Sequence, residues 1–428
     1  MPQASTCKPN ELRQTKDDDY FQNMDALTPS GNKAVLILGG SNFMGRALVE
    51  LLVERKVCIC IVNRGRRHWD TIDPSNGKAA HVFADRRDVE VFASRLAHVT
   101  LKLGRSWDLV ADFSAFDGKD ICAALAGLEG SFGTYAYISS DSVYEVTSWA
   151  AEEWKPRSQA GKQITVAEDA DDRPQDTALQ RKLKKADSYG HGKLDAEEAL
   201  AKEIPAENCK SISLRLPDVI GPFDGTLRLW AYWHWLRAGE AGAPPPQVKT
   251  FKRRAKKARC EDESAEAEVE EEEIPPDPPL ALVFSRDVAR FIATLLDRPA
   301  SQDAPRCDAV NLACERQAPL GELLGLLATA SGLQRERPRL AGCKRPKTFL
   351  PSVDRPWPLN LSHAMDMYGF VPTPLEDALK SCADFFQEGC SRFPREARRA
   401  AKKLPQDASE IAIRLAGLQD CDKSSDSS

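Results

Sequence analysis

The chain has 428 residues, of which 42% are hydrophobic and 29% are charged, and its formal net charge is −5. This composition is typical of a globular protein with a sizeable core, and the mild excess of acid gives no general attraction to nucleic acid or anionic membranes. No apolar run reaches about 18 residues, so the sequence predicts no membrane-spanning helix. Its 12 cysteines include no Cys-x-x-Cys pair, which predicts reduced thiols, no metal site and a cytoplasmic location.

The first 32 residues are polar and predict a disordered tail. The apolar residues 34–38 then run into a turn that contains Gly39 and Gly45, and a helical pattern follows to Glu54. A strand, a glycine turn and a helix in this order begin a dinucleotide-binding unit. Gly39 allows the tight turn, Gly45 lets the helix lie close to the strand, and the helix N-terminus attracts a pyrophosphate.

Five further apolar segments predict buried strands, with helical patterns between most of them. They are residues 57–62, 79–84, 107–112, 134–139 and 211–216. This alternation predicts an α/β fold with a doubly wound parallel sheet, the Rossmann fold that binds NAD(P). We assign this domain to residues 33–220 together with residues 281–315, where a strand pattern and a helix return.

The composition changes after residue 220. Residues 221–243, which carry Trp230 and two further tryptophans, combine with residues 316–395 into a smaller predicted C-terminal substrate domain. The tryptophan rings are expected mainly in its core, although they could also line a substrate pocket. Between the two parts, residues 244–280 form a low-complexity insert with a basic block followed by an acidic block. Residues 396–428 predict a charged tail.

Tyr189 and Lys193 are four residues apart and lie on one face of a predicted helix. The pKa of a tyrosine is about 10 in water, and a nearby ammonium favours the phenolate, which brings the phenol toward the range of a useful base. Gly190 and Gly192 beside the pair cost roughly 1 kcal/mol each against alanine in a helix. We interpret them as a sign that bulk is excluded there, as it would be by a ligand.

Ser140 follows the predicted strand 134–139. In a doubly wound sheet, ligands bind beyond the carboxyl ends of the strands. A hydroxyl at that edge can hold a substrate oxygen while a tyrosine moves its proton. The alternative is a serine-rich loop that caps the next helix.

Together, the glycine turn, the Ser140 region, the Tyr189/Lys193 pair, residues 214–222 and residues 285–287 resemble the extended short-chain dehydrogenase/reductase superfamily, specifically the NAD-dependent epimerase/dehydratase family. Residues 39–45 and 84–88 are more similar to its atypical branch, which contains the chloroplast stem-loop-binding proteins. The likeness spans about residues 33–390, interrupted by the charged insert. It implies an NAD(P)-dependent oxidoreductase or epimerase that acts on a hydroxyl or ketone carbon, such as one of a nucleotide sugar.

The resemblance also implies site residues. The catalytic positions match Ser140, Tyr189 and Lys193. The positions that surround the cofactor match Gly39, Asn42, Phe43, Met44, Gly45, Asn63, Arg64, Asp85, Arg86, Phe113, Ser114, Ala115, Lys193 and Pro217. Family members often dimerise through the helix that carries the catalytic tyrosine, so a homodimer stays open.

Three departures from the family pattern refine these expectations. Asn42 replaces the middle glycine of the turn, so the pyrophosphate turn must differ. Ser142 stands where the family's dehydratases carry a glutamate, which disfavours dehydration. The second strand ends in Asn63 and Arg64 rather than in an acid, and an arginine suits the 2′-phosphate of NADP. We therefore favour NADP, with NAD as the alternative.

Two other functions remain open from the sequence alone. The first is an RNA-binding protein on the same fold, supported only by the basic block at 249–259, which the acidic block at 261–273 largely neutralises. The second is a cofactor-bound sensor or scaffold with little turnover. The complete Ser/Tyr/Lys set favours an enzyme over a binding protein, because a binding protein needs no such set.

Overall fold

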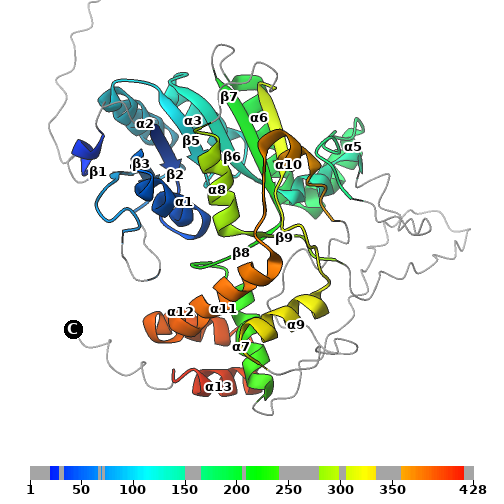
Figure 1. Cartoon of the computed structure of the whole chain (residues 1–428). Helices are drawn as coiled ribbons and strands as arrows, with labels where there is room; N and C mark the ends of the chain where they lie inside the picture. Colours follow the sequence, from blue (N-terminus) through cyan, green and yellow to red (C-terminus); the bar gives the residue numbers. More distant parts are fainter. Residues whose placement is uncertain are drawn as a thin grey trace, which may run out of the picture.

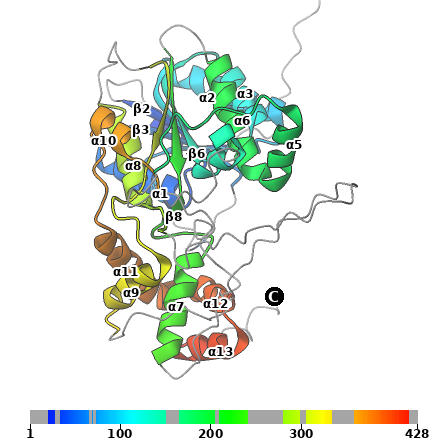
Figure 2. The same cartoon turned by 90° about the vertical axis from the view of Figure 1, so that its right-hand side faces the viewer.

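The computed structural model of the chain describes residues 20–27, 33–65, 69, 73–149, 165–204, 209–240, 279–297, 305–333 and 358–418. The predicted insert at 244–280 lies outside the described residues except for its last two. Figure 1 shows a twisted sheet with helices on both faces above a separate group of helices, and Figure 2 shows the same two parts from the side.

The main sheet has eight strands in the order β1-β4-β3-β2-β5-β6-β7-β10. Its strands are β1 (Phe21–Gln22), β2 (Ala34–Leu38), β3 (Cys58–Asn63), β4 (Ala80–Phe83), β5 (Trp107–Asp112), β6 (Phe132–Ser140), β7 (Lys210–Leu216) and β10 (Cys307–Asn311). All neighbouring strands are parallel except for the edge pair β1 and β4. The predicted doubly wound parallel sheet is therefore confirmed, and its order reverses at β2, where the glycine turn follows.

Helices cover both faces of the sheet (Figure 1). On one face, α1 (Phe43–Glu54) packs against α8 (Ser285–Thr294), and on the other lie α2 (Val89–Leu103), α3 (Gly118–Leu128) and α6 (Ser188–Glu203). Alternate residues of β2 belong to different cores: Leu36 faces one layer and Ile37 the other. This explains why β2 is apolar at every position, since both of its faces are buried.

Residues 20–27 are ordered, whereas the sequence predicted disorder through residue 32. Phe21 and Gln22 pair with β4, Leu27 is buried, and the Asn23 amide donates to the carbonyls of Gly77 and Ala79. A two-residue strand is too short to produce a periodic pattern, so no pattern in the sequence indicates it. Residues 1–19 and 28–32 lie outside the described residues.

The C-terminal domain is a helical group built around α7 (Arg228–Glu240). It also contains α9 (Leu320–Ala330) and α11 (Leu375–Arg392), and a two-stranded parallel sheet of β8 (Asp218–Ile220) and β9 (Leu282–Phe284) leads into it. Trp230 and Trp233 are 1% and 2% exposed and lie in its apolar core. The interpretation of these rings as core residues is therefore confirmed.

Two further helices, α12 (Pro394–Ala401) and α13 (Gln406–Leu415), pack on α7, where the sequence predicted a charged tail from residue 396. Their buried side is made of small residues: Ala397, Ala400, Ala401, Ala408 and Ala412. Alanines carry little weight in a search for apolar periodicity, and the basic residues on the outer side of α12 dominate its composition. Residues 419–428 lie outside the described residues.

The connecting elements complete the description. A short 3₁₀ segment, η3 (Asp141–Val146), follows β6, while α5 (Thr177–Ala186) precedes α6 and α10 (Ser362–Tyr368) lies beside β10. Another 3₁₀ segment, η2 (Met24–Ala26), follows β1. Within the part of the chain that the structure describes, no helix is long and apolar enough to cross a membrane.

One histidine is buried in the core of the C-terminal domain. His234 on α7 is 1% exposed and stacks on Trp230, with ring centroids 6.0 Å apart. Burial, with a smaller contribution from the charge of Arg237, lowers the pKa of His234 to about 3. The ring is therefore neutral in the folded protein at every pH above that value.

We expect His234 to make the protein less stable in mild acid. Below the ordinary histidine pKa of about 6.5 the unfolded chain binds a proton that the folded chain does not, so the free energy of unfolding falls by about 1.4 kcal/mol per pH unit. Between pH 6.5 and pH 5 the loss amounts to about 2 kcal/mol. Urea unfolding at pH 7.5 and pH 5 should show this extra loss in the wild type but not in His234→Phe. A His98→Gln variant, which changes an exposed ring on α2, is the control, and equal pH sensitivity of wild type and His234→Phe would contradict the assignment.

Candidate functional site

The glycine turn between β2 and α1 is as tight as the sequence predicted. Gly39 has φ +99°, a region that favours glycine. A Cβ on Gly45 would lie 2.7 Å from the carbonyl oxygen of Gly39, closer than any side chain can approach. Both predicted roles are confirmed: Gly39 makes the turn, and Gly45 lets α1 approach it.

The turn departs from the usual pattern at its centre. Asn42 is extended, with φ −134°, and the next residue, Phe43, takes the left-handed conformation with φ +50°. A bulky residue in that region costs of order 1 kcal/mol. The expectation that Asn42 changes the shape of the turn agrees with this geometry. The strained residue, Phe43, is the first residue of α1, and Met44 follows it in the helix.

Asn63, at the end of β3, fixes the turn from the side. Its amide nitrogen donates to the Ser41 hydroxyl at 2.7 Å, and its amide oxygen accepts from the Gly65 nitrogen at 2.7 Å. The side chain of Asn63 therefore links the second strand to the glycine turn. Arg64 beside it is exposed. The pKa of the nearby Asp85 carboxyl is lowered mainly by Arg87, and the charge of Arg64 adds a smaller contribution.

A buried carboxylate organises the segment after β5. Asp112 is 0% exposed and accepts hydrogen bonds from the backbone nitrogens of Ser114 and Ala115 at 2.9 and 3.0 Å. The Tyr135 hydroxyl donates to it at 2.6 Å. Burial acts to raise the pKa of Asp112, but the charge of Arg86 and these hydrogen bonds together hold it below its usual value. Asp112 thus shapes residues 113–115, which the family resemblance places beside the cofactor.

Arg86 is the partner of this carboxylate. Its guanidinium donates to Asp112 at 2.8 Å and to the Asp120 carbonyl at 2.9 Å, and it is 9% exposed. The side chain is therefore directed into the protein rather than outward, although the sequence placed both Asp85 and Arg86 beside the adenine. Asp85 is the exposed member of the two and pairs with Arg87.

Lys193 joins three elements at the centre of the predicted site. The Lys193 ammonium, on α6, donates to the backbone carbonyls of Ala115 and Ile138, each at 2.8 Å, at the ends of β5 and β6. Its nitrogen lies 5.8 Å from the ring centroid of Tyr189. Burial lowers the pKa of Lys193 to about 8, with Asp112 and Glu197 acting in the opposite direction. The ammonium is thus mostly protonated at neutral pH.

The loop that carries Ser140 lies against the helix that carries Tyr189 and Lys193. Ser140 is 7% exposed at the end of β6, and its hydroxyl accepts from the Ser142 nitrogen at 3.2 Å. Tyr189 is 45% exposed on the first turn of α6. The helix approaches the Ser140 loop so closely that a Cβ on Gly190 would lie 2.2 Å from the Ser142 carbonyl oxygen.

This contact corrects the interpretation of the two glycines. A Cβ on Gly192 would lie 2.8 Å from the Phe116 carbonyl oxygen, just as one on Gly190 would meet Ser142. Bulk is excluded at both positions by the protein backbone, not by a ligand. The glycines are still tied to the site, because they let α6 pack against the two loops that carry Ser140 and Ala115.

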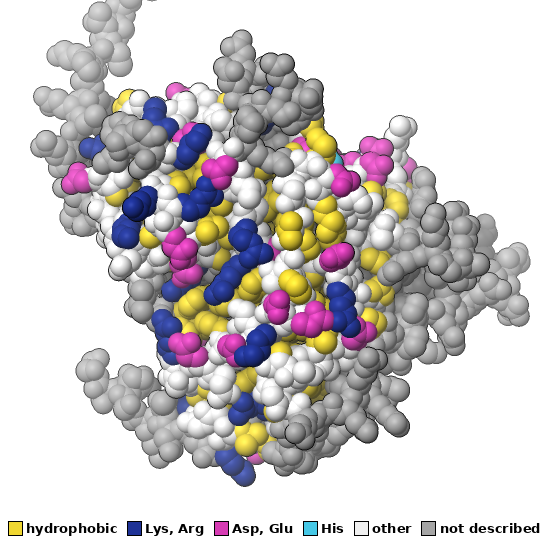
Figure 3. All heavy atoms as spheres, in the orientation of Figure 1, with side chains coloured by type: hydrophobic (Ala, Val, Ile, Leu, Met, Phe, Trp, Pro, Cys, Tyr) yellow, Lys and Arg dark blue, Asp and Glu magenta, His cyan; other side chains and the backbone are white. Residues whose placement is uncertain are grey.

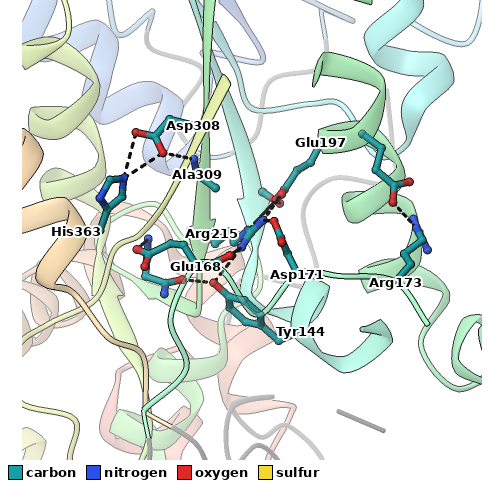
Figure 4. A network of polar contacts seen from close by, with 12 residues as sticks. Tyr144, Glu168, Asp171, Arg173, Glu197, Arg215, Asp308, Ala309 and His363 are labelled. Atoms are coloured by element: carbon teal, nitrogen blue, oxygen red, sulfur yellow. Dashed lines mark hydrogen bonds and ion pairs between the residues drawn. The ribbon is translucent and has the colours of Figure 1, made fainter. Parts of the chain in front are cut away.

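A buried arginine that sequence reasoning missed fixes α6 to the sheet (Figure 4). Arg215 on β7 is 1% exposed, and its guanidinium donates to Glu197 on α6 and to Asp171, each at 2.6 Å. It also donates to the Tyr144 hydroxyl at 3.2 Å, and Tyr144 in turn donates to Asn311 on β10. Burial acts to lower the pKa of Arg215, but Glu197 and Tyr144 raise it above its ordinary value.

The C-terminal domain meets the glycine turn through Phe223. The guanidinium of Arg46, on α1, lies 3.7 Å from the Phe223 ring centroid. Trp69, from the connection after β3, packs edge-on against the same ring and stacks on Trp230. A pocket of about 530 Å³ opens between Phe223 and α11. Pro217, which the resemblance places near the nicotinamide, is buried at the start of this passage between the domains.

A family model matches the part of the chain that contains the predicted site. Residues 35–238 match the model of the NAD dependent epimerase/dehydratase family. This part of the chain therefore resembles that family. The match confirms the family predicted from the motifs and, with it, the enzyme class: an NAD-dependent, epimerase-like enzyme. The closer likeness to the stem-loop-binding branch stays a prediction, and a sequence search among curated proteins finds no match.

Solved structures of similar fold include epimerases and a dehydratase. An epimerase from Methanothermobacter thermautotrophicus aligns with TM-score 0.57 at 16% identity, covering 87% of this chain and 97% of that one. UDP-glucose 4-epimerase from Thermotoga maritima, solved with UDP-glucose, gives 0.54 at 16%, covering 83% and 99%. UDP-glucuronic acid 4-epimerase from Bacillus cereus, solved with its substrate and NAD, gives 0.53 at 15%, covering 83% and 99%. At these identities, the likeness shows the fold alone.

We expect the buried pair of Arg215 and Glu197 to be needed for stability. Arg215→Met leaves the Glu197 carboxylate without its partner away from water, which should lower the free energy of unfolding by about 3–5 kcal/mol. Urea unfolding measures this loss. Arg55→Met is the control, because Arg55 pairs with the exposed Asp297 and should cost about 1 kcal/mol or less. Replacing Glu197 by leucine in the Arg215→Met background should recover part of the loss; similar costs for the two arginine variants would contradict the prediction.

Proposed function

We propose that this chain is an NADP-dependent oxidoreductase or epimerase that acts on a hydroxyl or ketone carbon of a nucleotide sugar. The observation that carries the proposal is the position of Lys193, whose ammonium bridges the ends of β5 and β6 and lies 5.8 Å from the Tyr189 ring. An ammonium has three N–H donors. Two of them are used by Ala115 and Ile138, and among the described residues no acceptor takes the third.

The surrounding residues fit a dinucleotide. Gly39 and Gly45 bring the backbone close to the start of α1, whose free N–H groups and dipole suit a pyrophosphate. The segment 113–115, shaped by Asp112, lies beside Lys193 and so faces the place where the nicotinamide ribose would be held. We assign the third Lys193 donor to that ribose. The cofactor, when bound, would supply the hydride or accept it.

The chain's own residues would handle the proton and the oxygen. Tyr189 would take the proton of the substrate hydroxyl as its carbon is oxidised and return it on reduction. The Lys193 charge favours the phenolate and thereby lowers the cost of that transfer. Ser140 would hold the substrate oxygen beside the phenol. With Ser142 in place of a glutamate, no carboxylate stands at that position to abstract a carbon-bound proton, so epimerisation or reduction is favoured over dehydration.

The cofactor preference and the substrate class rest on separate observations. Arg64 is exposed at the end of β3, where its guanidinium can meet a 2′-phosphate, and Asn63 already has both ends of its amide engaged. The nucleotide sugar is supported by two structural neighbours, which were solved with UDP-glucose and UDP-glucuronic acid. All described cysteines are free thiols, which supports the proposed cytoplasmic location.

An RNA-binding function has less support than the enzyme. Basic and acidic side chains are interspersed on the face of the molecule that Figure 3 shows, without a broad field of one sign. A phosphate backbone is bound by clustered Lys and Arg side chains. The basic block at 249–259 lies outside the described residues, and the described surface in this view adds nothing to it.

We expect Tyr189→Phe to keep cofactor binding and to lose at least about a hundredfold in turnover, because the proton has no carrier. NADPH binding is followed by fluorescence, and turnover by chromatography of UDP-sugars after incubation with the protein and cofactor. Tyr20→Phe is the control. It changes an exposed phenol next to β1, which is the edge strand farthest from β7 and β10. Undiminished turnover in Tyr189→Phe would refute the assigned role.

We also expect NADPH to bind more tightly than NADH. A hydrogen-bonded pair between Arg64 and the 2′-phosphate should be worth about tenfold or more in affinity. Arg64→Ala should lose that factor for NADPH and leave NADH binding unchanged, as measured by fluorescence titration. Arg55→Ala at the far end of α1 should change neither affinity. Equal affinities of the wild type for the two cofactors would remove the basis for NADP.

A further inference from the structure

Phe116 is an apolar ring left in solvent next to the predicted catalytic residues. It follows the segment 113–115 and is 62% exposed, more than Tyr189 at 45% or Tyr20 at 41%. No role was assigned to it from the sequence. Single exposed apolar residues are common on protein surfaces, so exposure alone decides nothing, and the surroundings of the ring must carry any argument.

The backbone that carries this ring is held firmly. The Phe116 nitrogen donates to the Asp120 carboxylate at 2.7 Å, and its carbonyl oxygen lies against Gly192, where a Cβ would be only 2.8 Å away. The preceding nitrogens of Ser114 and Ala115 are held by Asp112. Contacts from α3 and α6 therefore fix the backbone position of an aromatic residue whose side chain is mostly exposed.

The ring faces the predicted catalytic pair. It meets the Tyr189 ring edge-on, with centroids 6.2 Å apart and an interplanar angle of 71°. The Lys193 nitrogen lies 5.5 Å from its centroid, within the range of a cation–π contact. Phe116 and Tyr189 are thus two neighbouring exposed rings, and the buried ammonium lies at a similar distance from both.

We propose that Phe116 is a ligand-contacting residue. A ring of the ligand that has an apolar face packs against the Phe116 ring, and this contact positions the ligand beside the Tyr189 hydroxyl. Such a face belongs both to the nicotinamide of the cofactor and to the C–H side of a pyranose. The inference rests on the proposed function, because it takes Tyr189 and Lys193 as the reacting pair. It adds a residue that sets the orientation of the ligand and not its chemistry.

A contact between two copies of the chain is the competing use of this ring. The side chains that follow it at the start of α3 are charged: the N-cap Asp117, Lys119 and Asp120. Stable interfaces have an apolar centre with few charged groups, and the surroundings of Phe116 do not provide one. The ligand is the better occupant, and the experiment separates the two.

The test compares Phe116→Ala and Phe116→Tyr with the wild type. Leu101→Ala is the matched control, because Leu101 is an apolar side chain on α2 that is 81% exposed. NADPH is titrated first by fluorescence, and UDP-glucose is then titrated into the NADPH-bound protein by calorimetry. Light scattering after gel filtration gives the mass of each variant, and far-ultraviolet circular dichroism verifies its folding.

We expect Phe116→Ala to weaken one of the two titrations about tenfold, while Phe116→Tyr and Leu101→Ala stay within about twofold of the wild type. If Phe116→Ala weakens the affinity for NADPH, Phe116 contacts the nicotinamide. If it weakens the affinity for UDP-glucose, Phe116 contacts the sugar. Unchanged affinities in Phe116→Ala overturn the inference and leave the proposed function intact. So does a change in oligomeric mass without a change in affinity. If the wild type itself binds neither NADPH nor NADH, the proposed function fails, and this inference fails with it.

Discussion

The Lys193 ammonium donates hydrogen bonds at 2.8 Å to the carbonyls of Ala115 and Ile138, and by doing so it joins α6 to the ends of β5 and β6. Those two strand ends carry the segments expected to touch cofactor and substrate. A charge in a site 5% exposed is costly, and burial accordingly lowers the pKa of Lys193 to about 8. The two carbonyls reduce that cost. The same bonds fix Tyr189, one helical turn earlier, relative to Ser140, because all three positions depend on how α6 lies on the sheet.

Two buried ion pairs flank this ammonium, and in each of them a carboxylate and a guanidinium offset each other's charge. Asp112 with Arg86 lies on the β5 side, and Glu197 with Arg215 on the β7 side. Each carboxylate pairs with its own guanidinium rather than with Lys193, although the charges of both act to raise the pKa of Lys193. An ammonium without a dedicated counter-ion is suited to favour a phenolate nearby. Replacing either ion pair by apolar groups could preserve packing, but it would also remove the carboxylate bonds that hold residues 113–115 and α6 in place.

The sequence predicted those parts of the fold in which apolar periodicity is strong. The parallel strands of the central sheet were located because they form buried apolar runs, and the glycine turn and the helix that carries Tyr189 were located from their motifs. Asp112, Glu197 and Arg215 were missed as site residues, since a charged residue inside an apolar pattern looks like an exposed position. The signal that could have found Asp112 and Arg215 is their place within otherwise buried strands, where a charge must have a partner. The helices at 394–415 were missed because their contacts are made by alanines.

Around Tyr189, the backbone of α6 lies very close to the loops after β5 and β6. Gly190 and Gly192 bring α6 against the carbonyls of Ser142 and Phe116, so the loops after β6 and β5 are both fixed by the same helix turn. The ligand was not needed to explain the glycines, and their presence is therefore no evidence for one. The case for a ligand depends instead on the third donor of the buried Lys193 ammonium and on the rings of Tyr189 and Phe116, which the protein holds in place but leaves partly exposed. A fold that needed only packing at this corner would have buried those two rings or replaced them, because exposed rings on a rigid backbone contribute little to stability.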